Sequence, residues 1–143
     1  MKIDKMLESD LPSIVSLVEQ LGYPTSLEDL KTRFQNIKKY SQAELFVAKD
    51  LDVVCGYIQV NTEPLTLLDV PRAQVSALIV NEKVRRHGIG AALLAQAETW
   101  AKENGLAVVR VRSNTKRDNA HPFYEKEGYS LKKTSHLFVK NLD

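Results

Sequence analysis

Apolar residues near the start of the chain recur at the spacing of a helix. The residues that form this stripe are Leu11, Ile14, Val15, Val18 and Leu21. A stripe of this period predicts an amphipathic helix. Ser9 or Asp10 is expected to cap it, because short polar side chains accept hydrogen bonds from the first turn. Pro12 suits that turn, and Gly22 predicts the end of the helix.

A second apolar stripe follows the dipeptide Tyr23-Pro24. It consists of Leu27, Leu30, Phe34 and Ile37. The segment Thr25-Ser-Leu-Glu28 that precedes it has the spacing of a capping box, which marks the start of a helix. The chain therefore opens with two helices in succession.

The pattern changes from Glu44 onward to short segments rich in β-branched and apolar residues. They span Leu45–Ala48, Val53–Val60 and Ala73–Val80. Asp50-Leu-Asp52 is predicted to be the hairpin turn between the first two. These segments predict a largely antiparallel sheet.

The remainder of the chain alternates between helical and strand patterns. A helix is predicted from about Gly90 to Glu103 with Gly105 as its stop, followed by a strand within Ala107–Arg112. A short helix over Pro122–Glu127 and a last strand within Tyr129–Lys140 complete the order. If Lys2–Met6 forms the first strand, the order is βααβββαβαβ.

Composition agrees with one small domain over residues 1–143. The chain is 43% hydrophobic and 27% charged, which is ordinary for a globular protein able to bury a core. No apolar run approaches the ~18 residues of a membrane span, and the charged N-terminus lacks the apolar run of a signal peptide. A cytoplasmic location without membrane attachment is the expectation.

A glycine-rich turn carries the first functional signal. The run Val84-Arg-Arg-His-Gly-Ile-Gly-Ala91 lies between a strand and a helix. Gly88 and Gly90 let backbone N–H groups approach an anion, the positive end of the helix attracts it, and Arg85, Arg86 and His87 add charge. Glycines that merely turn the chain are the plainer alternative. We interpret the run as a pyrophosphate-binding turn.

Two nucleotide-binding motifs fit this turn poorly. A dinucleotide motif requires a small third residue where this chain has Leu93. An NTP-binding loop requires Gly-Lys-Ser/Thr, and Gly90-Ala-Ala92 supplies neither the lysine nor the hydroxyl.

The pattern Arg/Gln-x-x-Gly-x-Gly/Ala, met by Arg85, Gly88 and Gly90, resembles the acyl-CoA signature of the GCN5-related N-acetyltransferase family. A second motif supports it, because Asn119-Ala-His-Pro-Phe-Tyr124 leading to Gly128-Tyr129 is similar to the family's Asn-x-x-Ala/His-x-Phe-Tyr ending. The predicted order of elements is also the family's, so the resemblance covers nearly the whole chain.

The resemblance implies an α+β fold of three α/β/α layers, with a central mixed, mostly antiparallel sheet flanked by helices. It also implies an acetyl-CoA-dependent transferase acting on a primary amine by direct attack in a ternary complex. The pantetheine arm is then expected on a bulged strand that splays from its neighbour. The cofactor-binding residues that it implies are Leu78, Ile79, Val80, Arg85, Arg86, His87, Gly88, Ile89, Gly90, Ala91, Asn119 and Tyr124.

Tyr124 is the catalytic residue that the resemblance implies. A phenol, with a pKa near ~10, can protonate a departing thiolate and is itself protonated at neutral pH. Packing of its ring is the alternative role. His121 is interpreted as part of the start of the helix rather than as an acid or base.

The general base stays unassigned. Glu44, Glu63 and Asp69 lie at or beside strands, where solvated charges are common, and water can also carry the proton away. Groups predicted on the acceptor side are Tyr23, Tyr57, Gln59, Gln74 and Ser76.

Charge is distributed unevenly between the two parts of the chain. Residues 1–80 hold 8 Lys/Arg against 11 Asp/Glu, whereas residues 81–143 hold 12 against 7. The basic part contains the predicted phosphate site, so the acidic part favours a small cationic amine, or a peptide amine, as acceptor. A noncatalytic acyl-CoA-binding regulator stays open, and a net charge of +2 argues against nucleic acid as a partner.

The remaining signals concern cysteine, metals and assembly. Cys55 lies in an apolar strand and is expected to be packing. Three scattered histidines and one cysteine lack metal-ligand spacing, so no metal is expected. Monomer and homodimer both stay open.

Overall fold

The computed structural model describes residues 1–63, 66–84, 87–112 and 120–142. They divide into two compact units, Met1–Val111 and Arg112–Asp143. The elements in chain order are β1 (Lys2–Lys5), the 3-10 turn η1 (Glu8–Asp10), α1 (Leu11–Gln20), α2 (Leu27–Lys38), β2 (Ala43–Asp50), β3 (Val53–Thr62), β4 (Ala73–Val80), the 3-10 turn η2 (Glu82–Val84), α3 (Ile89–Glu103), β5 (Val109–Val111) and α4 (Ala120–Lys126).

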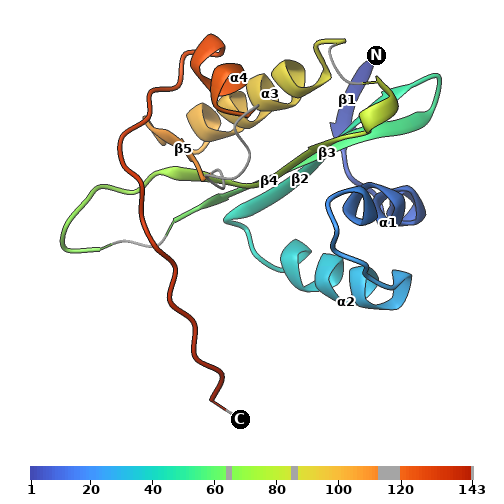
Figure 1. Ribbon diagram of the computed structural model, residues 1–143, viewed down its shortest axis with the longest axis horizontal. Helices are drawn as coiled ribbons and strands as arrows, with labels where there is room; N and C mark the ends of the chain where they lie inside the picture. Colours follow the sequence, from blue (N-terminus) through green and yellow to red (C-terminus); the bar gives the residue numbers. More distant parts are fainter. Residues whose placement is uncertain (64–65, 85–86, 113–119, 143) are drawn as a thin grey trace. The chain divides into compact units, whose positions relative to one another are not determined.

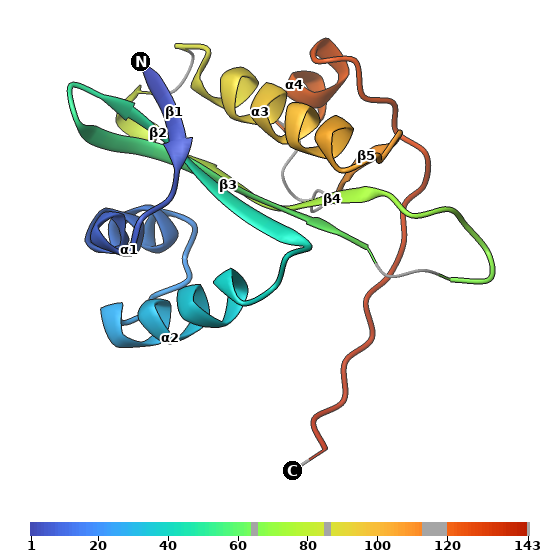
Figure 2. The ribbon, with the colours of Figure 1, turned by 180° about the vertical axis from the view of Figure 1, so that it is seen from behind.

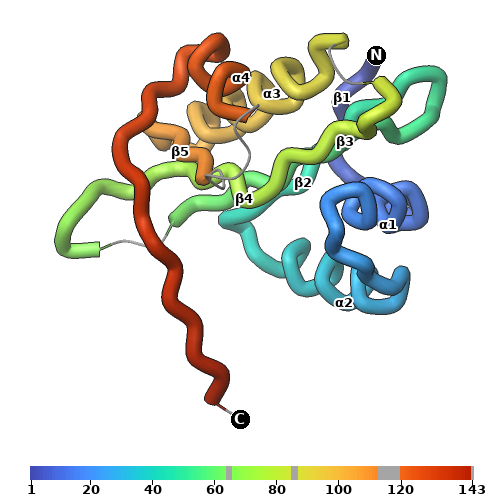
Figure 3. The backbone as a smooth tube through the Cα atoms, viewed as in Figure 1, coloured from blue at the N-terminus to red at the C-terminus, as the bar shows by residue number. Residues whose placement is uncertain are grey.

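The first unit is a five-stranded sheet between two layers of helix. The strands lie in the order β1-β2-β3-β4-β5; β1 to β4 are antiparallel, and only β5 runs parallel to its neighbour. Helices α1 and α2 cover one face and α3 covers the other (Figures 1 and 2). Figure 3 follows the chain from β1 through both helices into the β2–β3–β4 meander. The predicted mixed, mostly antiparallel sheet between helices is confirmed.

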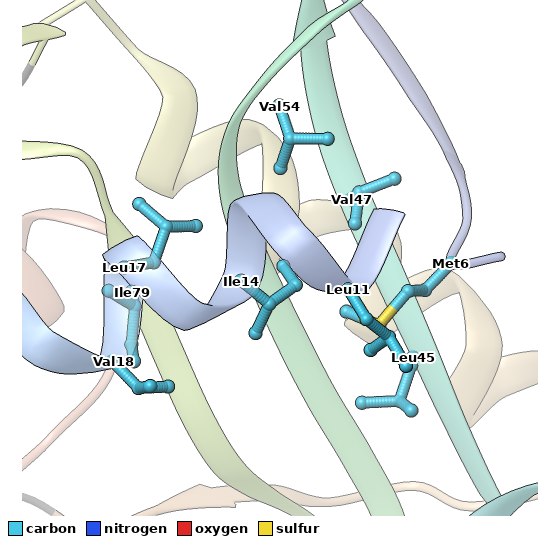
Figure 4. Packing of buried hydrophobic residues seen from close by; sticks show 9 residues of the cluster. All are labelled: Met6, Leu11, Ile14, Leu17, Val18, Leu45, Val47, Val54 and Ile79. Carbon is cyan, nitrogen blue, oxygen red and sulfur yellow. The ribbon is translucent and has the colours of Figure 1, made fainter. Parts of the chain in front are cut away.

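The core under α1 shows why the first stripe is helical. Leu11, Ile14, Leu17 and Val18 face the strands and are buried, as Figure 4 shows. Their partners from the strands and from the end of β1 are Met6, Leu45, Val47, Val54 and Ile79. Burial of a single Leu or Ile of this kind stabilises the fold by about 1.5–3 kcal/mol. Helix α1 is thereby fixed to the middle of the sheet.

Helix α2 packs more lightly than α1. It has no buried residue, although Leu30, Phe34 and Ile37 are half-buried against the same core. Its cap is Ser26, whose hydroxyl accepts a hydrogen bond from the Asp29 N–H at 3.0 Å. The cap is thus one residue later than the predicted box implies.

Asp10 does not cap α1 with its side chain, which corrects that expectation. Its carboxylate instead accepts from the Leu7 N–H (2.8 Å) and faces the Lys49 ammonium (3.0 Å). The buried carboxylate thus caps the turn η1 through the Leu7 N–H and pairs with Lys49 of β2, instead of capping α1.

The second unit contains α4 and an extended segment after it. Residues 129–142 form no strand, so the predicted last strand is wrong for this structure. A strand is defined by its pairing, and the contiguous apolar run Leu137-Phe138-Val139 lacks the alternation of a half-buried strand. All three of these side chains are exposed.

Candidate functional site

The pairing of β4 changes halfway along the strand. Up to Val75 it pairs with β3 on one edge and with β5 on the other, and the last pair with β5 is Val75 with Val111. Gln59 then pairs with Ala77 and Val60 with Val75, so Ser76 is the extra residue of a β-bulge. The bulge and the end of the β5 pairing therefore fall at the same level.

Beyond the bulge, β4 keeps one strand partner among the described residues. Ala77, Leu78, Ile79 and Val80 pair with residues 56–59 of β3, and the described part of β5, which ends at Val111, does not reach them. The edge of Ala77–Ile79 that faces away from β3 can accept an extended ligand with amide groups, which would pair as a strand does. The bulge expected from the resemblance is present, whereas the expected splay from β5 depends on residues 113–119, which lie outside the described residues.

The loop that follows β4 is held by backbone and by the end of α1. The Asn81 N–H donates to the Cys55 carbonyl at 2.8 Å, and the Val84 N–H donates to the Asn81 carbonyl at 3.0 Å. The Asn81 side-chain oxygen accepts from the Lys83 N–H at 3.0 Å and from the Gln20 amide at 3.4 Å. Gln20 in turn accepts from the Glu82 N–H at 3.0 Å. The route into the glycine turn is thus fixed at several points.

Gly88 caps α3 in a left-handed conformation. Its φ is +77°, which glycine adopts without strain. The first hydrogen bond inside the helix runs from the Ala92 N–H to the Gly88 carbonyl at 3.0 Å. The N–H groups of Ile89, Gly90 and Ala91 come before it and have no carbonyl partner within the helix. N–H groups at such a helix end are of the kind that bind anions in proteins, and His87 and Gly88 next to them are exposed.

Arg85 and Arg86, which were expected to add charge to this turn, lie outside the described residues. The same is true of Asn119. We call residues 77–84 and 87–91 together the turn end of the sheet.

The opposite end of the sheet carries an open pocket of about 780 Å³. Its lining residues are Ile37, Tyr40, Gln42, Ala43, Gln59, Asn61, Thr62, Glu63, Pro71 and Leu106. Asn61 accepts a hydrogen bond from the hydroxyl of the bulged residue Ser76. Thr62 Oγ1 is buried and has no partner among the described residues. The pocket therefore borders the bulge, where the open edge of β4 begins.

Glu63 at this pocket is paired with cations. Its Oε2 lies 2.6 Å from Arg72 Nε and 3.5 Å from an Arg110 guanidinium nitrogen. Asp69 faces the same Arg72, and the pKa of Asp69 is lowered by the Val70 N–H and by the charge of Arg72. The hydrogen bond to Glu63 raises the pKa of Arg72. We call the pocket and this ion cluster the pocket end.

The Glu44 carboxylate is also held by hydrogen bonds and ion pairs. Burial alone would raise its pKa, but hydrogen bonds from Lys38 (3.0 Å) and the Leu45 N–H (3.1 Å) outweigh burial, together with the charge of Lys5. The pKa of Glu44 is consequently lowered. Glu44, Glu63 and Asp69 thus all serve as ion-pair partners of lysine or arginine side chains.

The other predicted acceptor-side groups lie in different surroundings. Tyr23 is exposed, whereas Tyr57 packs on the α1 core and burial raises its pKa. Gln74 is buried; its amide donates to the Val75 carbonyl at 3.2 Å, and its oxygen has no partner among the described residues. Gln59 lines the pocket.

Tyr124 belongs to a small aromatic cluster in the second unit. Its ring lies 5.1 Å from that of Phe123 and 6.1 Å from that of Tyr129, measured between centroids and edge to face in both cases. The Tyr129 N–H donates to the Tyr124 carbonyl at 2.9 Å and Gly128 has a φ of +93°, which together end α4. The predicted short helix is confirmed, and its local contacts restrict the ring of Tyr124.

Comparison with known proteins identifies the fold's family. The model of the family described as "Acetyltransferase (GNAT) family" matches residues 10–129. The chain belongs to the GNAT acetyltransferase family. The family membership inferred from the two sequence motifs is thereby confirmed.

Two curated relatives and one solved structure are similar to this GNAT protein. Aminoalkylphosphonate N-acetyltransferase of Salmonella typhimurium is 40% identical over 70 residues, which cover 48% of this chain and 44% of that protein. The uncharacterized N-acetyltransferase YhdJ of Bacillus subtilis is 27% identical over 130 residues, 90% of this chain and 87% of that protein.

The solved structure is that of AAC(6')-Iy with the bisubstrate analogue CoA-S-monomethyl-acetylneamine. It matches this GNAT chain with a TM-score of 0.86 at 15% identity, over 99% of this chain and 98% of that one. At this identity the likeness establishes the fold.

Sequence reasoning missed several residues of the pocket end of this GNAT domain. Asn61, Thr62, Arg72 and Arg110 were given no role, because nothing in the linear pattern brings together positions so far apart in the chain. Within the described ranges, no group of three or more His, Cys, Asp and Glu residues is placed to hold a metal ion. Of the helices in those ranges, none is both long and apolar enough to cross a membrane.

Proposed function

We propose that this protein is an acetyl-CoA-dependent N-acetyltransferase that acetylates the primary amine of a small acceptor within a ternary complex. The observation that carries the proposal is the coincidence of the Ser76 bulge with the end of the β4–β5 pairing. Beyond the bulge, Ala77–Ile79 has β3 as its one described strand partner, and the neighbouring helix α3 begins with N–H groups that have no carbonyl partner within the helix. These two features match two adjoining parts of acetyl-CoA, the amide-bearing pantetheine arm and the pyrophosphate.

The fit of the cofactor rests on backbone groups. Leu78, Ile79 and Val80 would pair with the pantetheine amides, and the N–H groups of Ile89, Gly90 and Ala91 would bind the pyrophosphate. Arg85, Arg86, His87 and Gly88 complete the proposed phosphate turn, and Asn119 is proposed to hydrogen-bond the pantetheine arm. The bound cofactor supplies an acetyl group as a thioester.

Transfer requires one bond to form and one to break. The nitrogen of the acceptor amine attacks the thioester carbonyl, a C–N bond forms, and the C–S bond breaks. An N–H near Ile79 or Val80 would stabilise the carbonyl oxygen as it gains charge. Tyr124 is proposed to give its phenolic proton to the departing thiolate and to regain a proton from water afterwards. The proton released by the amine passes to water, because the three carboxylates considered above are engaged in ion pairs.

The acceptor is proposed to occupy the pocket end, next to the bulge. Asn61, Gln59 and Tyr40 offer neutral polar groups, and Glu63 is already neutralised by its two arginines. Preference for a small cationic amine would therefore come from the net acidic charge of residues 1–80 rather than from one carboxylate. The names of the relatives suggest two test classes, aminoalkylphosphonates and aminoglycosides.

Calorimetric titration with acetyl-CoA, followed in the same sample by thiol release with a panel of amines, tests the proposal. The panel pairs an aminoglycoside, an aminoalkylphosphonate and a neutral primary amine. Binding with amine-dependent release supports a transferase, and preference for the phosphonate would overturn the cationic acceptor. Binding without release from any amine favours a noncatalytic acyl-CoA-binding regulator, and absence of binding removes the proposal.

A further inference from the structure

Gly56 lies in β3 at a position that both β4 and α3 border. It pairs with Val80, the last residue of β4, and it follows Cys55, the extra residue of a second bulge between β2 and β3. The Cys55 carbonyl next to it holds the Asn81 N–H that begins the loop to α3. Gly56 therefore adjoins the step from the open edge of β4 into the glycine turn.

The reason for glycine at position 56 is space. The glycines with positive φ are Gly22, Gly88, Gly105 and Gly128, and Gly56 is not among them. A Cβ built on Gly56 would lie 2.9 Å from the Ile79 carbonyl oxygen, 3.2 Å from Leu93 Cδ1 and 3.4 Å from Ile89 Cγ2. The first of these contacts is with backbone, which cannot rotate away as a side chain can.

These three neighbours belong to the two elements that the proposed cofactor site uses. Ile79 lies on the open edge of β4, and Ile89 and Leu93 lie in the first turns of α3. Leu93 is fully buried and Ile89 nearly so, which leaves little room for either to yield. A methyl group at position 56 would therefore push the Ile79 carbonyl and the start of α3 away from it.

We propose that Gly56 is a positioning residue that sets the spacing between the edge of β4 and the N-terminus of α3, so that one acetyl-CoA molecule contacts both. This inference rests on the proposed function. Gly56 itself contacts neither the pantetheine arm nor the pyrophosphate. Its effect is on whether the pantetheine arm and the pyrophosphate are bound at the same time by one molecule.

The experiment compares a whole ligand with its two parts in the unmodified protein and in Gly56→Ala. The ligands are acetyl-CoA, S-acetylpantetheine and adenosine 3′-phosphate 5′-diphosphate, titrated by calorimetry. Affinity for acetyl-CoA is expected to fall by about tenfold or more, because joined parts bind well only when both subsites keep their spacing. Affinity for each part is expected to fall by no more than about threefold, because each part uses one element.

Two controls separate spacing from stability. Gly105→Ala places a methyl in open space at a φ of +73°, so it strains the fold at the far end of α3 and is expected to leave all three affinities unchanged. If Gly56→Ala does not fold, Gly56→Ala/Leu93→Val is used. The shorter side chain at position 93 gives room beside α3 and leaves the contact with the Ile79 carbonyl.

For Gly56→Ala, steady-state kinetics should show a raised KM for acetyl-CoA with a smaller change in kcat.

Different outcomes reject different claims. Equal losses of affinity for the whole ligand and for its parts, or no loss at all, would overturn the role of Gly56 and leave the proposed function standing. Failure of the unmodified protein to bind acetyl-CoA would instead reject the proposed function.

Discussion

The two ends of the sheet are built from different parts of the polypeptide. At the turn end, the open edge of β4 and the N-terminus of α3 present mainly backbone groups. At the pocket end the groups are side chains: Glu63 pairs with Arg72 and Arg110, and Asn61 accepts a hydrogen bond from Ser76. Backbone groups are the same in every sequence, so the turn end suits a cofactor shared by a family. Side chains differ from chain to chain, so the pocket end is where a particular acceptor can be selected.

The contrast between the two ends predicts that affinity for the cofactor can be altered separately from turnover and from the choice of acceptor. Changes at the turn end should alter the binding of acetyl-CoA whatever the amine. Changes at the pocket end should alter the KM of the amine and leave the cofactor's affinity as it is.

Tyr124→Phe is expected to have the largest effect, and it should change neither the affinity for acetyl-CoA nor the affinity for the amine. Loss of the phenolic proton should lower kcat by about 100-fold, the smaller end of the range for a general acid. The dissociation constant of acetyl-CoA should change by less than about twofold, because the ring is kept. Stopped-assay kinetics and calorimetry measure the two quantities.

Tyr129→Phe is the matched control for Tyr124→Phe. It removes a hydroxyl from the ring that contacts Tyr124 edge to face and keeps that ring contact. Its kcat should equal that of the unmodified protein. An equal fall in both variants would assign the effect to the aromatic cluster rather than to a proton donor.

Gly88→Val is expected to weaken acetyl-CoA binding about tenfold. A β-branched residue at a φ of +77° is strained, so the turn that presents the N–H groups of α3 must change its conformation. Gly105→Val carries the same substitution at a φ of +73° at the other end of α3. Calorimetry should find weaker binding in the first variant alone. Similar losses in both would show that general destabilisation is the cause.

Asn61→Ala is expected to raise the KM of the amine about fivefold. The variant removes both the pocket-lining amide and its hydrogen bond with Ser76, an interaction of about 1 kcal/mol. The KM of acetyl-CoA should not change, and this contrast tests the separation of the two ends. Gln35→Ala, on α2 with its amide bonded to Glu8, is the control outside the pocket. A raised KM for the cofactor would contradict the separation.

Glu44→Gln is expected to have the smallest effect, on stability alone. The pKa of Glu44 is lowered in the folded protein, so its contribution is present above the unfolded value near 4.5 and is lost as the pH falls through the folded value. Urea unfolding at pH 7 should show a loss of about 1–2 kcal/mol in the variant. The difference between the two proteins should shrink at pH 3.5. A constant difference at both pH values would exclude the charge of Glu44 as its source.

The turn end was largely predictable from sequence because its signals are local. The strand Ala73–Val80 and the helix near Gly90–Glu103 follow from hydrophobic period, and Gly88 is required by a left-handed cap. Backbone geometry of this kind leaves a mark on consecutive residues. The position of the bulge at Ser76, by contrast, depends on pairing with β3 and could not be located without it.

The pocket end was poorly predictable because its contacts join distant residues. Glu63 and Arg110 meet through the pairing of three strands, and Asp10 meets Lys49 across the sheet instead of capping α1. Gly56 was passed over as an ordinary strand residue, since its need for space arises from Ile79, Ile89 and Leu93. The last strand, within Tyr129–Lys140, was inferred from composition without a known partner.

The second bulge of the sheet has a practical consequence for enzymology. Cys55, the chain's single cysteine, is buried there, donates its thiol to the Ala48 carbonyl at 3.3 Å, and has its pKa raised by burial. A thiol of this kind reacts slowly, because the thiolate is the reactive form. A colour-forming thiol reagent mixed with native protein and acetyl-CoA should therefore measure the coenzyme A released, with almost no background from the protein. The same reagent would react with Cys55 only when the sheet opens.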